Sequence, residues 1–250
     1  MSLNLADAAI DIYAPRKKLM GLLPNPFRAL ILGSSGAIGS AFMELLQSNP
    51  LCSEVVGIHR NSAHPLDYQK PDSIESSAVA LSLEAPFQLI INTIGLLHTD
   101  EWMPEKRLDD LNAQQLTELM KINAIGPALT IRHFSKLLDP KQSIMVTLSA
   151  KVGSIEDNRL GGWYSYRASK AALNMLIKTA SIELTRTKPN IVLIAMHPGT
   201  VNSRLSKPFR GQEIGRAATL AASDMFQVIA NLQKEDSGRF LSYSGEKLPW

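Results

Sequence analysis

The chain has 250 residues with a formal net charge of +3, and 45% of its residues are hydrophobic and 20% charged, which suits a folded domain with a full core. The charges are interspersed, so we expect no nucleic-acid partner. The single cysteine, Cys52, excludes an internal disulfide, and the five dispersed histidines lack the spacing of a metal site.

Residues 1–26 precede the first strand signal and mix acidic and basic residues with short apolar pieces. They do not read as a secretory signal, and no apolar run of the chain has the length of a membrane span, so we expect a cytoplasmic protein with no membrane partner. Residues 5–13 could form a short amphipathic helix. Pro24 and Pro26 end any such helix, which favours an extension that is loose or partly docked.

Residues 27–32 form an apolar run of strand length, followed by a glycine-rich turn and a helical pattern at about 41–48. Strand, glycine turn and helix is the arrangement that binds the pyrophosphate of a dinucleotide, because backbone N–H groups can approach the phosphates there. The turn offers Gly33, Ser35, Ala37, Ile38 and Gly39 as cofactor-binding candidates. The spacing differs from G-x-G-x-x-G, so an ordinary strand-to-helix turn is the simpler alternative.

Apolar runs and helical patterns alternate along the rest of the chain. Strands are expected at residues 54–58, 87–92, 143–148, 191–196 and 240–243, the last at a sheet edge. Helices are expected at about 108–125, 126–138, 165–187 and 212–233. This alternation predicts an α/β fold in which residues 27–250 form a single domain, a doubly wound (Rossmann-type) parallel sheet with helices on both faces.

Glycine-rich or polar segments follow four of the predicted strands. They are Gly33, Asn92 to Gly95, Ser149, and His197 to Thr200. In a doubly wound sheet the ligand binds outside the carboxyl ends of the strands. Each segment alone is an ordinary turn, but their convergence favours a common binding site.

Tyr166 and Lys170 stand four residues apart at the start of the helix predicted at 165–187, so the phenol and the ammonium share one helix face. The unperturbed pKa of tyrosine is about 10, and a close ammonium favours the phenolate. The pair is therefore typical of a general acid/base that exchanges a proton with an alcohol or carbonyl oxygen. Tyr164 is the rival, but Ala168 rather than a lysine lies four residues beyond it.

Together these motifs resemble the short-chain dehydrogenase/reductase superfamily over residues 27–250. The resemblance is carried by Gly33, Gly36, Gly39, Asn92 to Gly95, Asn123, Ser149, Tyr166 with Lys170, and His197 to Gly199. Segments 148–155 and 161–167 look like the C-factor branch, which is similar to the sniffer-type carbonyl reductases. The resemblance implies hydride transfer between a nicotinamide cofactor and a small-molecule carbonyl or alcohol.

The resemblance also implies roles for individual residues. Tyr166 would donate the proton, Lys170 would hold the nicotinamide ribose and favour the phenolate, and Ser149 would orient the substrate oxygen. Asn123 would kink its helix and position a water molecule. The cofactor-binding set is Gly33, Ser35, Ala37, Ile38, Gly39, Arg60, Asp67, Asn92, Gly95, Tyr166, Lys170, Pro198, Gly199 and Thr200.

Ser149 departs from the family pattern. Many relatives have two serines at this strand end, the second of them catalytic, and Ala150 fills the second place here. Because neighbouring strand residues face opposite sides, Ser149 could serve only with a local bulge, and Ser154 is a distant substitute.

The cofactor prediction depends on the end of the strand at 54–58. An acidic residue there would accept the ribose hydroxyls, whereas Arg60 can bind a 2′-phosphate with its guanidinium. We therefore expect NADP(H) as the preferred cofactor, with NAD(H) as the alternative. Asp67 is expected at the adenine amino group, or else as a turn cap before Pro71.

Three functions are compatible with the sequence. The first is an NADP(H)-dependent oxidoreductase, and the second is a C-factor-like signalling protein that binds NAD(P) with little or no turnover. The third is an interaction protein without nucleotide, which the intact Gly33, Gly39 and Lys170 disfavour. By resemblance, residues 203–212 occupy the place of a substrate lid, and a homodimer through the helices near 108–138 and 165–187 is expected.

Overall fold

One parallel sheet of six strands, in the order β2-β1-β3-β4-β5-β6, forms the centre of a computed structural model that describes residues 21–250. The strands are β1 (Phe27–Leu32), β2 (Cys52–Ile58), β3 (Leu89–Asn92), β4 (Ser143–Leu148), β5 (Ile191–His197) and β6 (Phe240–Ser242). Because β2 and β3 lie on opposite sides of β1, the order reverses at β1, as in a doubly wound sheet. The predicted fold class is confirmed.

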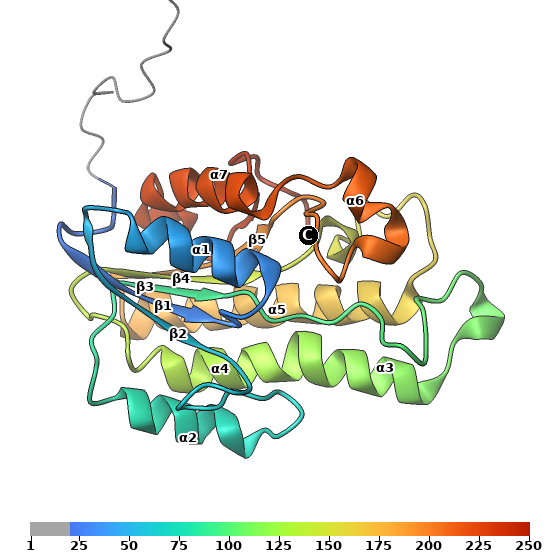
Figure 1. The fold of residues 1–250 in the computed structure, drawn as a ribbon, viewed down its shortest axis with the longest axis horizontal. Helices are drawn as coiled ribbons and strands as arrows, with labels where there is room; N and C mark the ends of the chain where they lie inside the picture. Colours follow the sequence, from blue (N-terminus) through green and yellow to red (C-terminus); the bar gives the residue numbers. More distant parts are fainter. Residues whose placement is uncertain (1–20) are drawn as a thin grey trace, which may run out of the picture.

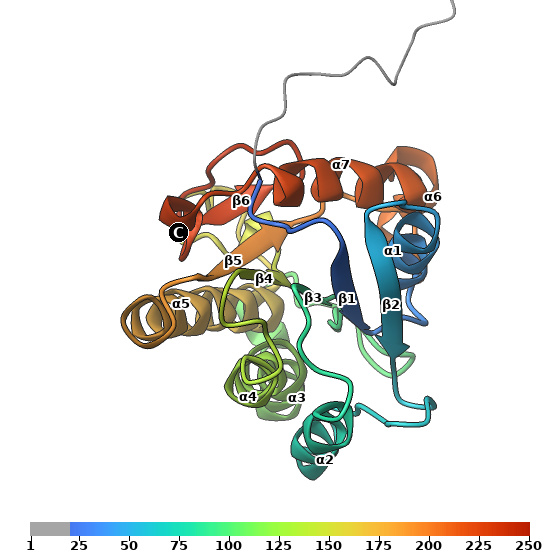
Figure 2. The ribbon, with the colours of Figure 1, turned by 90° about the vertical axis from the view of Figure 1, so that its left-hand side faces the viewer.

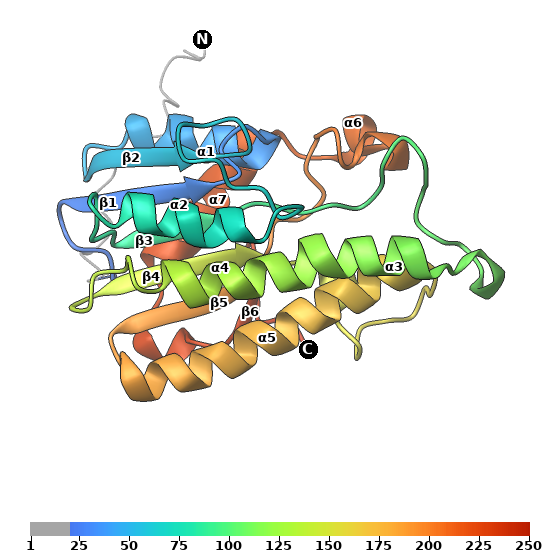
Figure 3. The same cartoon turned by 90° about the horizontal axis from the view of Figure 1, so that it is seen from below.

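Helices cover both faces of this sheet (Figures 1 and 2). The helices are α1 (Ala37–Gln47), α2 (Asp72–Leu81), α3 (Ala113–Met120), α4 (Gly126–Phe134), α5 (Tyr164–Thr187), α6 (Gly211–Ile214) and α7 (Ala218–Ala230). Helices α1 and α7 pack on one face, while α2, α4 and α5 pack side by side on the other (Figure 3). Because both faces of the sheet are covered, the inner strands have no solvent-exposed side, and every residue of β3 and β4 is buried.

Two helical predictions need correction, and one helix was missed. Helix α2 was not predicted, because its sequence is rich in Ser and only Ile74, Ala78 and Leu81 give it a buried apolar face. The helix predicted at 108–125 is divided by Asn112, whose side chain caps α3. The helix predicted at 212–233 is divided into α6 and α7 because Arg216 leaves the helical conformation to pair with Val201.

Residues 21–26 run beside α7 before β1 begins. Leu22 is buried among the residues on the α1 and α7 face. A Cβ atom at Gly21 would lie 1.7 Å from the carbonyl oxygen of Ala230, so the backbones touch there. The helix predicted at 5–13 lies outside the described residues. Within residues 21–250, no helix combines the length and the apolarity that crossing a membrane requires.

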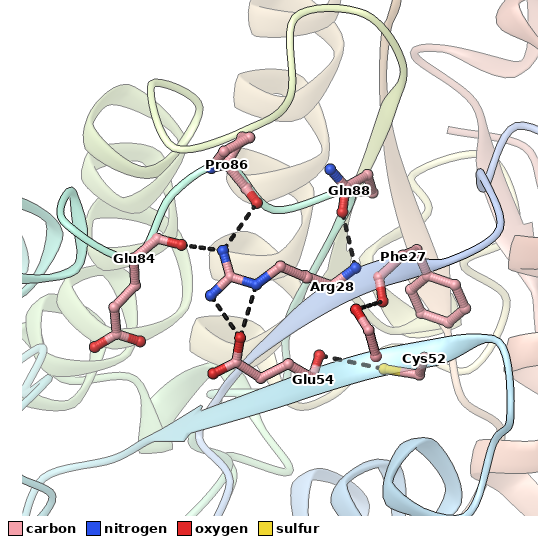
Figure 4. A network of polar contacts seen from close by, with 8 residues as sticks. Phe27, Arg28, Cys52, Glu54, Glu84, Pro86 and Gln88 are labelled. Carbon is pink, nitrogen blue, oxygen red and sulfur yellow. Dashed lines mark hydrogen bonds and ion pairs between the residues drawn. The ribbon is translucent and has the colours of Figure 1, made fainter.

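Arg28 joins three segments at the amino ends of the strands (Figure 4). Its guanidinium forms an ion pair with Glu54 of β2 at 2.6 Å and donates to the carbonyl oxygen of Glu84, while its backbone N–H donates to Gln88 at 2.8 Å. Arg28 therefore ties β1 to β2 and to the segment before β3, at the end of the sheet opposite to the predicted site.

Candidate active site

The turn between β1 and α1 has the geometry that close backbone approach requires. Gly33 has φ +83°, and a Cβ atom there would lie 2.8 Å from Oγ1 of Thr93. A Cβ atom at Gly39 would lie 2.2 Å from the carbonyl oxygen of Gly33, so α1 packs directly on the turn. Glycine is needed at both positions for steric reasons.

The amino end of α1 is open. Gly36 precedes the helix in an extended conformation, no side chain of the described residues caps it, and its first turn has no acidic residue. Ser35 and Gly36 are exposed, while Ala37 and Ile38 are half-buried. Unpaired N–H groups and the helix dipole favour an anion here, so this turn fits the pyrophosphate of a dinucleotide.

The two residues predicted to contact the adenosine half follow β2. Arg60 is exposed and has no ion-pair partner within residues 21–250. Asp67 accepts a hydrogen bond on Oδ1 from the backbone N–H of Gln69 at 3.0 Å, which is the turn-capping alternative. Its other carboxylate oxygen remains for a ligand.

Gly95, Asn123 and Lys170 converge at the carboxyl end of β3. The side chain of Asn92 shapes the turn, because it accepts from the backbone N–H of Ile94 at 3.1 Å and donates to the Tyr68 hydroxyl at 2.9 Å. A Cβ atom at the exposed Gly95 would lie 3.5 Å from both Oδ1 of Asn123 and Nζ of Lys170. Glycine thus leaves an open approach to these two polar atoms.

Asn123 lies in a π-helical turn, Lys121–Ile125, between α3 and α4. Its side chain is fully buried and clamps the loop after β3, accepting from the backbone N–H of Leu96 at 2.8 Å and donating to the carbonyl oxygen of Leu96 at 2.7 Å. A further hydrogen bond of 3.1 Å to Ser169 ties the turn to α5. The helix is therefore distorted at Asn123, as the resemblance implied.

Tyr166 and Lys170 lie on the buried face of α5. Nζ of Lys170 donates to the carbonyl oxygen of Leu148 at 3.1 Å and lies 5.9 Å from the centroid of the Tyr166 ring. Burial lowers the pKa of Lys170 to about 8 and raises that of Tyr166. Desolvation is the cause of the raised Tyr166 pKa in this structure, and the stabilisation of the phenolate by Lys170 stays a prediction. The phenol is kept in its acid form.

Ser149 is not brought together with Tyr166. Its hydroxyl donates to Oδ1 of Asn174 at 2.6 Å beneath α5, whereas Ala150 packs against the cluster that contains Tyr166. Ala150 is extended, so the alternation of the strand continues past β4 and the expected bulge is absent at this point. The hydroxyl of Ser154 donates to the carbonyl oxygen of Trp250 at 3.2 Å, so it too is engaged by a partner other than Tyr166.

The segment after β5 contributes Pro198, Gly199 and Thr200. Gly199 has φ +76°, and a Cβ atom there would lie 2.8 Å from the Tyr243 ring. The Thr200 carbonyl oxygen accepts a hydrogen bond from the backbone N–H of Arg216 at 2.9 Å, and the Thr200 residue is exposed. A hollow between α7 and β6 contains none of the predicted site residues.

His197 is the last residue of β5, and no role was predicted for its side chain. It is largely buried beside Lys151 and Lys170, and its Nδ1 atom has no hydrogen-bond partner in the described part of the chain. Burial first, and then these two lysines, lower the pKa of His197 to about 4. The imidazole is therefore neutral at pH 7.

Sequence reasoning also missed the residues that fix the start of α5. The buried carboxylate of Glu105 accepts from the hydroxyl and the backbone N–H of Ser165, and its backbone carbonyl accepts from Trp163 at 2.5 Å. Nothing in the local pattern marks Glu105 as buried. Asn174 was predictable in principle, because it continues the four-residue spacing of Tyr166 and Lys170.

The family model described as short chain dehydrogenase matches residues 59–214. A 1-hydroxy-2-glutathionyl-2-methyl-3-butene dehydrogenase of Rhodococcus sp. (strain AD45) is 32% identical over 74% of this chain and 78% of its own. The C-signal protein of Myxococcus xanthus is 32% identical over 66% of this chain and 93% of its own.

Solved structures share the fold. The carbonyl reductase Sniffer of D. melanogaster superposes with a TM-score of 0.76 at 20% identity, over 90% of this chain and 99% of its own. The NADPH-bound carbonyl reductase from chicken fatty liver has a TM-score of 0.75 at 24% identity, over 91% and 100%.

A doubly wound sheet with an anion-binding turn at its switch point defines a dinucleotide-binding protein. The match over residues 59–214 narrows this class, and the chain belongs to the short-chain dehydrogenase/reductase family of oxidoreductases.

Proposed function

We propose that this oxidoreductase reduces a carbonyl, or oxidises an alcohol, with Tyr166 as the general acid/base. The observation that carries the proposal is the convergence of Gly95, Asn123 and Lys170 beside the buried phenol of Tyr166. A nicotinamide cofactor, when bound, supplies or accepts the hydride at the substrate carbon. Tyr166 transfers its hydroxyl proton to the substrate oxygen, so that an alcohol forms from the carbonyl.

The neighbouring groups prepare Tyr166 for this step. Burial keeps the phenol protonated before reaction, and Lys170, with a pKa of about 8, is mostly cationic at pH 7 and stabilises the phenolate that remains. Asn123 holds the loop after β3 beside Lys170. Ser149 acts on this site only through Asn174 and α5, as a positioning residue.

The test is oxidation of NADPH with a panel of aldehydes and ketones. We expect Tyr166→Phe to lower turnover by a factor of about 100 or more while binding of NADPH is retained. Tyr164→Phe is the matched control, because this second tyrosine is exposed and has no lysine one turn further on. Equal losses in the two variants, or full activity of Tyr166→Phe, would contradict the role of Tyr166.

We propose NADP(H) as the cofactor because Arg60 is exposed and unpaired within the described chain, at the end of β2, where a 2′-phosphate would lie. Arg60→Ser should weaken NADPH binding about tenfold and leave NADH binding unchanged. Isothermal titration with both cofactors measures this, and tighter binding of NADH by the unaltered protein would refute the preference.

A second candidate is a nucleotide-binding signalling protein with little turnover. Ala150 favours it, because the hydroxyl expected beside Tyr166 is absent there, and so does the similarity to the C-signal protein. NADPH binding without oxidation by any carbonyl compound would select this function. Restored oxidation in Ala150→Ser would then identify the alanine as its cause.

We also propose a homodimer in which α5 packs against α5 of a second copy. Met175 and Ile182 stand seven residues apart on α5, so they share one face of the helix, and they are 67% and 44% exposed. Ile125, in the π-helical turn, is 50% exposed. Apolar exposure of this extent on adjacent elements is typical of a protein–protein contact.

A further inference from the structure

The side chains around the Tyr166 phenol form an apolar group that we call the Tyr166 cluster. Its buried members are Leu97, Leu119 and Tyr166, and its half-buried members are Leu96, Trp102, Ala150, Val152, Trp163, Leu205 and Phe209. They come from the loops after β3, β4 and β5 and from the adjoining helices. A substrate that reaches Tyr166 must therefore present mostly carbon to the protein.

Phe209 of the lid segment, residues 203–212, contacts two aromatic rings, Trp163 of this cluster and the neighbouring His98. Its ring centroid is 4.8 Å from that of Trp163 and 5.8 Å from that of His98, and Trp163 in turn lies 6.1 Å from Tyr166. Both rings meet Phe209 at steep angles, 57° and 69°, as in edge-to-face contacts, so the space that Phe209 occupies beside them, which we call the slot, suits an aromatic ring.

Phe209 fills this slot but leaves polar groups unsatisfied. Nε1 of Trp102 and Nε2 of His98 are buried and have no hydrogen-bond partner within residues 21–250. Their loop is ordered, since Thr99 donates to the Trp102 carbonyl at 3.1 Å and Trp102 donates to Oγ1 of Thr99 at 3.3 Å. Buried polar atoms without partners are costly, so water or a ligand completes their bonding, and two such atoms near Phe209 offer polar contacts to a ligand there.

The lid segment is joined to the rest of the domain at its ends, where backbone hydrogen bonds of 2.9 Å join Arg216 to Thr200 and Asn202 to Arg216. Between these ends, Leu205 and Phe209 pack in the Tyr166 cluster, and Arg204 forms an exposed ion pair of 3.9 Å with Asp100 of the loop after β3. The exposed pair contributes little. The cost of moving Phe209 is therefore mainly its aromatic packing, which the ring of a substrate would replace.

We propose that the substrate is an aryl aldehyde or ketone whose ring takes the place of the Phe209 ring beside Trp163 and His98, and whose second oxygen accepts a hydrogen bond from the Trp102 indole. The proposal rests on the proposed function for the reacting carbonyl, which Tyr166 protonates. An indole N–H only donates, so the second polar group of the substrate is an acceptor. His98 donates or accepts according to its tautomer.

The experiment compares aldehydes that differ in one acceptor oxygen. The pairs are 2-, 3- and 4-acetylbenzaldehyde and the corresponding isopropylbenzaldehydes, which have similar shapes. The kcat/KM for formation of the alcohol at the aldehyde carbon, which separates it from any reduction of the acetyl ketone, is measured by product analysis. Its ratio for acetyl over isopropyl is compared between the unaltered protein and Trp102→Phe, so that intrinsic reactivity cancels. For at least one ring position we expect the ratio to fall five- to tenfold in Trp102→Phe, about the effect of one hydrogen bond. Trp163→Phe, which removes another indole from the cluster, should leave the ratio unchanged.

A second variant tests the replacement of Phe209. Phe209→Ala should lower KM for all of these aldehydes severalfold, because the competing ring is gone. A raised KM would show instead that Phe209 is a wall against which the substrate packs, and would overturn the replacement. If the acetyl-to-isopropyl ratio of kcat/KM is the same in Trp102→Phe and in the unaltered protein for all three ring positions, the hydrogen bond between Trp102 and the second oxygen is contradicted.

Binding separates this inference from the proposed function. In Tyr166→Phe saturated with NADPH, the dissociation constants of each acetyl and isopropyl pair are measured by titration calorimetry, with and without Trp102→Phe. The same five- to tenfold change in their ratio supports the site even if no aldehyde is reduced. If aldehydes are reduced but the ratio does not change, the proposed function stands and the inference fails.

Discussion

Ala150 and Ser149 show how one position along a strand decides what a side chain can do. Ser149 bonds to Asn174 within the core, and Ala150 meets the Tyr166 cluster. We expect Ser149→Ala to lower the free energy of unfolding by about 1–2 kcal/mol, because Asn174 loses a buried partner, and to change kcat less than threefold. Chemical denaturation and steady-state kinetics measure both.

Ala150→Ser is the complementary change. A hydroxyl at position 150 would face the substrate oxygen beside Tyr166, so we expect kcat to rise while the stability changes little. A Ser149→Ala variant that loses activity as severely as Tyr166→Phe would show that the hydroxyl of Ser149 reaches the substrate after all.

The buried His197 makes stability depend on acidity. Its pKa of about 4 in the folded protein lies below the unfolded value of about 6.5, so the unfolded chain binds the proton more tightly. The unfolding free energy should therefore fall as the pH decreases from 6.5 to 4, by about 2–3 kcal/mol from this group. His197→Asn should remove this part of the decline. The unfolding free energies of the unaltered protein and of His197→Asn are measured by urea titration at pH 7 and pH 4.5. An equal loss of unfolding free energy in the two proteins would exclude this role of His197.

At the scale of elements, the start of α5 depends on a residue far away in the sequence. Glu105 holds Ser165, and Arg167 donates to the Gly162 carbonyl at 3.0 Å, so the first turn is fastened from two sides. Glu105→Ala should lower the unfolding free energy by about 1–3 kcal/mol and reduce kcat by misplacing Tyr166. Glu105→Gln, which keeps an acceptor oxygen, should lose less than half as much unfolding free energy as Glu105→Ala. Identical denaturation curves for the two variants would argue against a bonding role.

The elements that sequence patterns predicted are those whose packing is local and apolar. Residues 143–148 are buried along their whole length, so a continuous apolar run could only be an inner strand. Helix α2 escaped prediction because five of its ten residues are polar and two are alanines. The break at Arg216 escaped it because it depends on pairing with Val201. The buried bonds of Glu105 were equally beyond reach, since their partner Ser165 is 60 residues away in the sequence.

At the scale of the whole molecule, the exposed face of α5 predicts the oligomeric state. Met175→Glu with Ile182→Glu should convert a dimer into a monomer, because two charges would be buried at the contact. Light scattering after gel filtration measures the mass. Val79→Glu is the matched control, since Val79 is 64% exposed on α2, away from this face. A monomeric unaltered protein would contradict the homodimer.

Trp163 has φ 52°, a left-handed conformation that a bulky residue adopts only under strain of about 1–3 kcal/mol. Glycine would adopt it freely, as Gly161 and Gly162 do just before it. Trp163→Gly would relieve this strain but would also remove the indole that packs on Phe209 and Tyr166. The chain thus keeps a strained backbone at position 163, and what it retains in exchange is an aromatic side chain beside the proposed acid.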